Sequence, residues 1–327
     1  MRYVVIGAGA VGGALGGRLF QHGHEVVLVA RGAQYRELRE HGLSLETPSG
    51  VHRLPVPVVW HPSNLDLRAD DVLVLAVKSQ DTAAAVDAWE SRPVEGGGTA
   101  GTRLPLVCAQ NGVANERIAL RGFRRVYALC VSLPATHVRP GAVTAWGSPV
   151  TGVLRLGVYP SGVDAVSEAV AADLAGSAFT AESVADAMRW KHGKLVANLG
   201  NAVEALCGGQ PGVEDVWRAA LAEGEAVLTA AGIAHAPAAE LSGGFDVRPV
   251  GGETREGGST WQSLARGTGS IETDFLNGEI VLLGREHGIA TPVNEALQVL
   301  ARQFAVEHRE AGSLPALDLL DAVGLKV

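Results

Sequence analysis

Short apolar runs alternate with helical patterns through the first half of the chain. Residues 3–6, 24–31 and 71–78 contain such runs, which are typical of strands buried on both faces of a parallel sheet. Residues 11–20 have the composition of a helix packed on a sheet, and residues 104–116 repeat the order of strand, polar turn and helix. This alternation predicts an α/β domain with a parallel sheet.

The pattern changes in the second half of the chain. Residues 125–157 are rich in Val, Thr and Gly and predict further strands that close the sheet, and residues 164–183 predict a helix and a last short strand. From Ala185 onward long helical patterns follow one another, and β-rich runs almost disappear. The sequence therefore predicts an α/β domain at 1–184 and an all-helical domain at 185–327.

A glycine-rich turn joins the first predicted strand to the first predicted helix. Gly7, Gly9 and Gly12 have the spacing G-x-G-x-x-G. In this motif the first glycine allows a tight turn, the second lets phosphates approach the backbone, and the third lets helix and strand pack closely. The first N–H groups of the helix and its positive dipole end favour a pyrophosphate. We therefore expect a dinucleotide site formed by Gly7, Ala8, Gly9, Ala10, Val11 and Gly12.

The residue that ends the second predicted strand selects the cofactor. A site for NAD usually has an Asp or Glu about twenty residues beyond the glycines, where it accepts hydrogen bonds from the ribose 2′-OH. This chain has Arg31 there. A guanidinium cannot accept those bonds, but it can pair with a 2′-phosphate and stack on adenine. Arg31 therefore predicts NADPH as the cofactor, unless it is an ordinary surface arginine.

Two further polar residues stand at the ends of predicted strands. Lys78 ends the run at 71–78, and Asn111 follows the run that starts at Leu104. Ligands of open α/β sheets bind beyond the carboxyl ends of the strands, and an Asn side chain offers both a donor and an acceptor. We expect Lys78 to lie near the cofactor and Asn111 to contact cofactor or substrate. His137 is expected to be structural.

Three polar residues share one face of the first helix predicted in the second domain. Lys194, Asn198 and Asn201 are spaced i, i+4 and i+7. Burying them is costly unless they meet partners, so we expect a ligand between the domains, with a hydrogen-bonded seam as the alternative. Gly193 and Gly200 weaken this helix and are expected to permit a close approach to the first domain or to the cofactor.

Arginine is the usual cation of this chain, which has only four lysines: Lys78, Lys191, Lys194 and Lys326. Because a lysine can lose its proton and an arginine effectively cannot, an internal lysine is expected to be present for its own chemistry. Ser259 either caps a predicted helix or binds a carboxylate. Glu272 stands where another helix opens, a position at which acidic residues often only complement the helix dipole.

The composition of the chain limits the kinds of ligand and partner that we expect. A formal net charge of −8 argues against a nucleic-acid-binding surface. The three cysteines lack the spacing of a disulfide framework or a zinc site, so we expect no metal and a reducing cytoplasm. No apolar run approaches the roughly eighteen residues of a membrane span, and the N-terminus does not have the pattern of a signal peptide. The helical domain is a candidate surface for a homodimer.

Together the motifs resemble those of the ketopantoate reductase family (2-dehydropantoate 2-reductases) along essentially the whole chain. The matching segments are G-A-G-A-V-G-G at 7–13, V-K-S-Q-D-T around Lys78, Q-N-G-V around Asn111, W-x-x-x-K-L-V-x-N at 190–198, S-x-x-Q at 259–262, E-x-D-x-x-N-G at 272–278 and G-I-x-T-P-V-N at 288–294. The chain is one residue shorter than the pattern after Asn198 and one residue longer before Glu272, and Ser263 replaces a common Asp. These departures lie on the substrate side.

The resemblance implies a Rossmann domain followed by an all-α domain like the C-terminal domain of 6-phosphogluconate dehydrogenase. It also implies hydride transfer from NADPH to the 2-keto group of ketopantoate, which gives pantoate for pantothenate and coenzyme A synthesis. Carried over by position, Lys194 corresponds to the general acid and Glu272 to its partnering carboxylate. A ketone that accepts hydride builds negative charge on oxygen and needs a proton donor, so the chemistry agrees with this assignment.

The resemblance implies roles for the remaining polar residues as well. Asn111, Asn198 and Ser259 would hold the carboxylate and hydroxyl of the substrate, Asn201 matches a further Asn only with a gap, and Lys78 would lie at the nicotinamide end. Lys191 remains an alternative acid. Two other functions stay open: reduction of another 2-keto or 3-hydroxy acid, and a catalytically silent sensor that binds NADPH.

Overall fold

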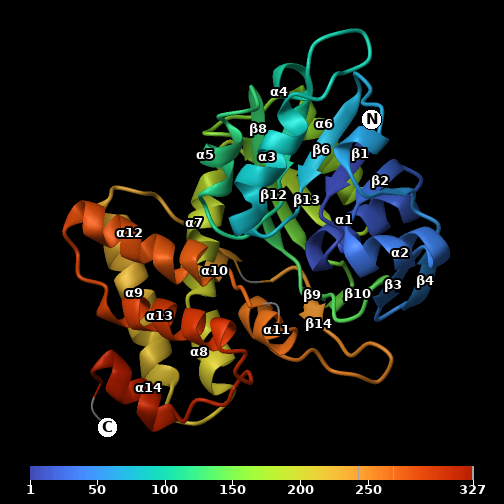
Figure 1. Ribbon diagram of the computed structural model, residues 1–327. Coiled ribbons are helices and arrows are strands. Elements are labelled where there is room, and N and C mark those ends of the chain that lie inside the picture. The colour runs from blue at the N-terminus through green and yellow to red at the C-terminus, as the bar shows by residue number, and fades with distance from the viewer. Residues whose placement is uncertain (242, 268, 326–327) are drawn as a thin grey trace. The chain divides into compact units, whose positions relative to one another are not determined.

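The computed structural model describes residues 1–241, 243–267 and 269–325 (Figure 1). The chain forms two compact units. The first comprises Met1–Trp190 with Ser242–Arg255, and the second comprises Lys191–Leu241 with Glu256–Val327. The division therefore falls inside a helix, a few residues beyond the boundary predicted at 184, and a later segment returns to the first unit.

An eight-stranded sheet forms the centre of the first unit. Its strand order is β13-β12-β8-β7-β6-β1-β2-β5. The strands are β1 (Arg2–Ile6), β2 (Glu25–Val29), β5 (Val58–Val59), β6 (Asp71–Leu75), β7 (Pro105–Cys108), β8 (Arg125–Ser132), β12 (Val153–Val158) and β13 (Thr180–Ser183). From β5 to β8 all neighbours are parallel, and β12 is antiparallel to β8. The parallel strands therefore direct their carboxyl ends to one edge.

Helices cover both faces of this sheet (Figure 1). Along β1, Tyr3 and Val5 belong to the core that includes α1 and α6, whereas Val4 and Ile6 belong to the core that includes α3, α4 and α5. The helices of this unit are α1 (Ala10–Gln21), α2 (Gly32–His41), α3 (Thr82–Glu90), α4 (Ala100–Arg103), α5 (Asn115–Ala119) and α6 (Ala165–Ala175), with 3-10 turns η1 (Pro62–Asn64) and η2 (Ser79–Asp81). This arrangement confirms the predicted Rossmann-type α/β fold.

A second sheet covers the outer side of α1. It has the order β4-β3-β10-β9, and its strands are β3 (Leu43–Thr47), β4 (Gly50–Leu54), β9 (Ala135–Thr136) and β10 (Ala142–Ala145). Glycines on α1 leave room for it, because a Cβ on Gly13 would lie 2.6 Å from Cγ2 of Val143 and a Cβ on Gly17 would lie 2.8 Å from Cδ2 of Leu43.

The prediction that residues 125–157 all close the main sheet was therefore wrong in part. Only β8 and β12 join it. Strand β10 pairs with β9 and with β3, and β11 (Gly147–Ser148) pairs with β14 (Asp246–Val247). The pattern of alternating residues gives strands but does not identify their partners.

The second unit is helical wherever the structure describes it, which confirms the predicted all-helical domain. Its elements are α7 (Ala187–Asn198), which begins in the first unit, α8 (Asn201–Cys207), α9 (Glu214–Ala230), α10 (Ala238–Leu241), α11 (Ser259–Ala265), η3 (Thr273–Phe275), α12 (Asn277–His287), α13 (Pro292–Val306) and α14 (Ala316–Val323). Helices α9, α12 and α13 pack against one another.

The helix predicted to carry Lys194, Asn198 and Asn201 is interrupted. Helix α7 ends at Asn198, and Gly200 is the N-cap of α8. A Cβ on Gly200 would lie 2.1 Å from Nε1 of Trp217, and a Cβ on Gly193 would lie 2.2 Å from the carbonyl oxygen of Ala236. The two glycines thus permit close packing inside the second unit, and their expected approach to the first domain or to the cofactor stays a prediction.

A buried chain of polar groups supports this interruption. Asn277 Nδ2 donates to the carbonyl oxygen of Leu199, between the two helices, at 3.1 Å and to Oδ1 of Asn294 at 3.0 Å. Asn294 Nδ2 donates in turn to Oε2 of Glu223 at 2.8 Å, and that carboxylate also accepts from the backbone N–H groups that open α13. Two asparagines of the family motifs therefore hold the helices together.

Candidate functional site

The glycine turn between β1 and α1 has the predicted order of strand, turn and helix. Gly7 has a φ of +103°, which favours glycine, and a Cβ on Gly12 would lie 2.0 Å from the carbonyl oxygen of Gly7. Gly9 is the N-cap of α1 and forms no side-chain cap. A Cβ on Gly9 would meet nothing within 4 Å. The third glycine is thus required for packing, whereas the second faces open space at the positive end of the helix.

This difference gives a paired prediction. Gly12→Ala should lower the free energy of unfolding by about 3 kcal/mol, because the new methyl group overlaps the backbone of Gly7. Gly9→Ala should leave stability within about 0.5 kcal/mol, since φ is −83° at Gly9, but it should weaken nucleotide binding about tenfold. Chemical denaturation and fluorescence titration with NADPH measure the two effects. Equal losses of stability in both variants would contradict the assignment.

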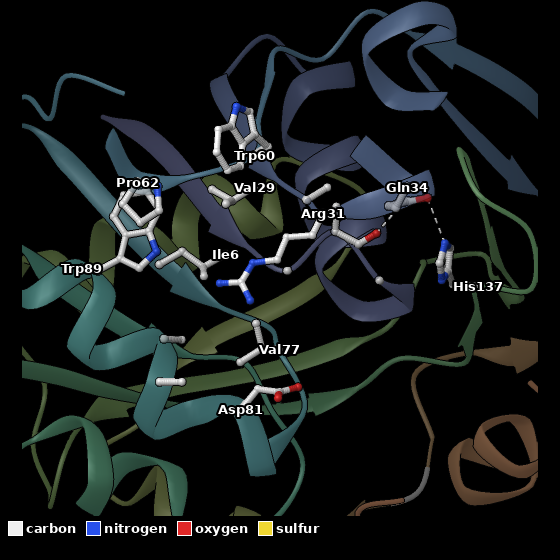
Figure 2. A pocket seen from close by; sticks show the side chains of 16 residues that line it. Ile6, Val29, Arg31, Gln34, Trp60, Pro62, Val77, Asp81, Trp89 and His137 are labelled. Carbon is white, nitrogen blue, oxygen red and sulfur yellow. Dashed lines mark hydrogen bonds between the residues drawn. The ribbon is translucent and has the colours of Figure 1, made fainter. Parts of the chain in front are cut away.

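A pocket of about 290 Å³ opens beside the glycine turn. Residues from the turn, the ends of β2 and β6, the start of α3 and the loop after β9 line it. Figure 2 shows the Arg31 side chain extending into this pocket toward Val77 and Asp81, with Trp60, Pro62 and other apolar side chains along one wall. The strand ends therefore bring Arg31 and the glycine turn to one pocket, as the sequence predicts for a dinucleotide site.

A second hollow of about 460 Å³ shares Arg31 and Trp60 with the first. Gly32, Tyr35, Arg36 and His61 complete its lining. Two guanidinium groups therefore border the same hollow, and the Trp60 ring, which packs at 5.3 Å from the ring of His61, is 52% exposed. This chemistry suits an anion next to an aromatic base.

Lys78 and Asn111 follow neighbouring strands, as predicted. Lys78 lies three residues beyond the end of β6 as the N-cap of η2, and Asn111 follows β7. The two segments touch, because Ser79 Oγ donates to the carbonyl oxygen of Asn111 at 3.3 Å and Asn115 Nδ2 donates to the same oxygen at 2.9 Å. Both Lys78 and Asn111 are half-buried. Neither belongs to the described lining of the 290 Å³ pocket.

In the second unit, the structure brings Asn201 to the start of α11. Glu204 Oε2 accepts from the N–H of Gly258 at 2.7 Å, and a Cβ on Gly258 would lie 3.2 Å from Oδ1 of Asn201. Ser259 follows directly as the first residue of α11. Gly258, not Ser259, is the N-cap, so of the two roles considered for Ser259 the helix cap is excluded and the carboxylate contact stays a prediction.

Lys194 and Asn198 remain one helical turn apart on α7. Both are half-buried, whereas Lys191 is 3% exposed. Glu272 is the N-cap of η3, and its side chain forms no cap. Burial lowers the pKa of Arg266, and the negative charge of Glu272 opposes this decrease. A guanidinium group that the sequence did not single out therefore lies close enough to Glu272 to interact electrostatically with it.

Comparison with known proteins identifies the family. The family model "Ketopantoate reductase PanE/ApbA" matches residues 3–160, and the model of its C-terminal part matches residues 186–305. A protein of Archaeoglobus fulgidus named 2-dehydropantoate 2-reductase is 32% identical over 311 residues, which cover 92% of this chain and 97% of that protein. The chain belongs to the ketopantoate reductase family. The resemblance seen in the motifs is confirmed.

Other family members support this assignment. A Halobacterium salinarum 2-dehydropantoate 2-reductase is 30% identical over 318 residues, covering 92% of this chain and 98% of that protein. The crystal structure of a PanE/ApbA family ketopantoate reductase from Ralstonia eutropha JMP134 has a TM-score of 0.77 and 28% identity and covers 95% of this chain and all of that one. A further structure shares the fold alone. It is D-mandelate dehydrogenase, solved with NADH and anilino(oxo)acetate, with a TM-score of 0.79 and 22% identity over 94% of this chain and 99% of that one.

The structure also shows pocket residues that the sequence did not single out. Gln34 and Trp60 line the pocket, and so does His137, which was expected to be structural. Gln34 lies three residues after Arg31 and therefore one turn further along α2, a spacing that could have indicated it. Trp60 directly follows β5, at the same sheet edge as the glycine turn. The position of His137 depends on the second sheet, which the sequence did not predict.

Metal-ligating clusters and helices able to span a membrane are both absent from the described residues. No group of three or more His, Cys, Asp or Glu side chains there is arranged to hold a metal ion. No helix in that part of the chain combines the length and apolar character that crossing a membrane requires. The three cysteines, Cys108, Cys130 and Cys207, are buried, and burial raises the pKa of the Cys207 thiol to about 11.

Proposed function

We propose that this protein reduces ketopantoate to pantoate with NADPH. The pocket that joins the open Gly9 position to the Arg31 guanidinium is the observation that carries this proposal. The family supplies the substrate, since its relatives in Archaeoglobus fulgidus and Halobacterium salinarum are named 2-dehydropantoate 2-reductase. The protein would therefore be an oxidoreductase that acts on a small keto acid.

The residues of the first unit fit a nicotinamide nucleotide. The first N–H groups of α1, behind Gly9, would hold the pyrophosphate. Arg31 would pair with the 2′-phosphate, which distinguishes NADPH from NADH, while Lys78 and Asn111 would lie toward the nicotinamide. When bound, the cofactor supplies the hydride. The same fold holds NADH in D-mandelate dehydrogenase, so the choice of NADPH rests on Arg31.

The residues of the second unit supply the proton and the substrate contacts in this proposal. Reduction of the ketone places negative charge on oxygen, and the Lys194 ammonium would donate the proton to that oxygen. Glu272 would orient the ammonium and favour its charged form. Asn198, Asn201 and Ser259, together with Asn111 from the first unit, would bind the carboxylate and hydroxyl of ketopantoate. Lys194 is half-buried whereas Lys191 is enclosed, which favours Lys194 as the acid.

A second candidate keeps the chemistry and changes the substrate to another 2-keto or 3-hydroxy acid. The interruption between α7 and α8 favours it, because this chain is one residue shorter than the family pattern just there and Asn201 begins a new helix. An altered spacing of the polar side chains would change which acid fits.

Oxidation of NADPH, followed at 340 nm with a panel of 2-keto acids and with no acid, tests both candidates. The proposal predicts that kcat/KM is at least tenfold higher for ketopantoate than for any other acid in the panel. Turnover of a different acid with none for ketopantoate would establish the second candidate instead. Tight binding of NADPH without turnover of any acid would indicate a sensor and contradict both.

A further inference from the structure

The side chain of Gln34 joins three segments that are far apart in the sequence. Its Nε2 donates to the carbonyl oxygen of Ala8 at 2.7 Å. Its Oε1 accepts from the N–H of Gly141 at 2.7 Å and contacts Nε2 of His137 at 3.0 Å. Figure 2 shows Gln34 between the glycine turn and His137, with the hydrogen bond to His137 as a dashed line. The glycine turn, α2 and the loop between β9 and β10 thus meet at one amide.

The orientation of this amide is fixed by the two backbone groups. The carbonyl oxygen of Ala8 can only accept, and the N–H of Gly141 can only donate, so the nitrogen of Gln34 faces Ala8 and its oxygen faces Gly141. The ring nitrogen of His137 that meets this oxygen must therefore carry a hydrogen. All three contacts require a side chain of this length that has a hydrogen-bond donor and a hydrogen-bond acceptor at its end, as glutamine does.

The contact with Ala8 determines the direction of a neighbouring N–H group. The carbonyl of Ala8 and the N–H of Gly9 belong to one planar trans peptide, in which they point in opposite directions. A hydrogen bond that holds the carbonyl toward α2 therefore directs the Gly9 N–H away from α2. Gly9 is the N-cap of α1, and the space above its Cα is open. The turn consists of glycines and alanines around this peptide, so it has no polar side chain of its own to hold it.

We infer that Gln34 is a positioning residue for the cofactor, which holds the Ala8–Gly9 peptide in the orientation that receives the pyrophosphate. This inference rests on the proposed function, because it assigns the pyrophosphate of a nicotinamide nucleotide to the glycine turn. Gln34 and Arg31 lie one turn apart on α2. The same helix therefore serves two parts of the nucleotide, with Gln34 acting on the pyrophosphate through the backbone and Arg31 on the 2′-phosphate directly.

The two roles separate when ligands carry only one of the two groups. NADH has the pyrophosphate without a 2′-phosphate, whereas adenosine 2′-monophosphate has the 2′-phosphate without a pyrophosphate. Gln34→Met keeps the length of the side chain and removes its hydrogen bonds. It should raise Kd about tenfold for both NADPH and NADH, as expected for a lost hydrogen bond near a charged ligand, and leave Kd for adenosine 2′-monophosphate within twofold. Arg31→Ala should raise Kd for NADPH and for adenosine 2′-monophosphate, which both carry the 2′-phosphate, and leave Kd for NADH within about twofold.

A second variant keeps the fold while removing only the donor. Gln34→Glu retains an acceptor for Gly141 and His137 but places a carboxylate oxygen against the Ala8 carbonyl, so its effect on Kd for NADPH and NADH should exceed that of Gln34→Met. In both variants kcat at saturating NADPH should stay within about twofold, because the proton donor is untouched. Arg39→Ala, an exposed change on the same helix, is the control for helix integrity and should match wild type.

Calorimetric titration of wild type and variants with the three ligands decides the question. Unchanged Kd for NADPH and NADH in both Gln34 variants would overturn the inference, and so would an equal loss for adenosine 2′-monophosphate, which indicates general damage to the pocket. A wild-type protein that binds none of the ligands would contradict the proposed function itself, because the site would then not be a nucleotide site.

Discussion

Lys194→Ala should lower kcat by about a hundredfold to ten-thousandfold, the range for loss of a positioned general acid, while Kd for NADPH stays within about twofold. The expected split follows from the proposed division of labour, in which the first unit binds the cofactor and Lys194 donates the proton to the ketone oxygen. Single-turnover kinetics with ketopantoate and a separate fluorescence titration with NADPH measure the two quantities independently.

Lys191 provides the matched control, because it lies three residues earlier on the same helix and is buried. Lys191→Met retains most of the apolar stem and removes the charge, so it should alter thermal stability more than kcat. If Lys194→Ala keeps the wild-type kcat and a folded Lys191→Met has a much lower kcat, then Lys191 is the acid and the assignment to Lys194 is wrong. Circular dichroism of each variant verifies that the fold is retained.

Arg31→Asp should reverse the coenzyme preference. The guanidinium that would pair with the 2′-phosphate is lost, and the new carboxylate repels that group while it can accept hydrogen bonds from the free ribose 2′-OH of NADH. The ratio of kcat/KM for NADPH to that for NADH should fall by at least about a hundredfold, since charge-assisted hydrogen bonds each contribute about 1.5–3 kcal/mol. Steady-state kinetics with both cofactors at a fixed ketopantoate concentration measures this ratio.

The control for Arg31 lies on the same helix. Arg39 is exposed and stands in the last turn of α2, and it is absent from the described linings of both hollows. Arg39→Asp makes the same change of charge and should leave the ratio of kcat/KM values within about twofold. A ratio that does not change in Arg31→Asp, or that changes equally in both variants, would remove Arg31 from the cofactor site.

The cofactor side of the fold was predictable because its signals are local in the sequence. Gly7, Gly9 and Gly12 lie within six consecutive residues. Arg31, Lys78 and Asn111 each follow a parallel strand, and the carboxyl ends of these strands meet at one edge of the sheet. The type of a residue and its position after an apolar run are then sufficient to place it at this edge of the sheet. The motifs in both halves of the chain predicted membership of the ketopantoate reductase family, and the comparison with family models confirms this prediction.

The remaining features depend on contacts between distant residues. The amide of Gln34 reaches Gly141, which is 107 positions away, through a second sheet whose pairing the sequence did not predict. The break between α7 and α8 places a carbonyl where Asn277, 78 positions away, donates to it. Helical periodicity cannot reveal such a break, because the donor that compensates for the lost helical hydrogen bond comes from another helix. Arg266 was missed for a different reason: it is close to Glu272 in the sequence, but no helical or strand spacing indicates that the two charges interact in the folded chain.

The reaction proposed for this protein is the reduction of ketopantoate with NADPH. Incubation with ketopantoate and NADPH carrying two deuterium atoms at C4 of the nicotinamide, followed by mass spectrometry and NMR of the product, tests it most directly. We expect pantoate with one deuterium at C2 for each NADPH oxidised. Product without deuterium, or unconsumed NADPH beside unchanged ketopantoate, would contradict it.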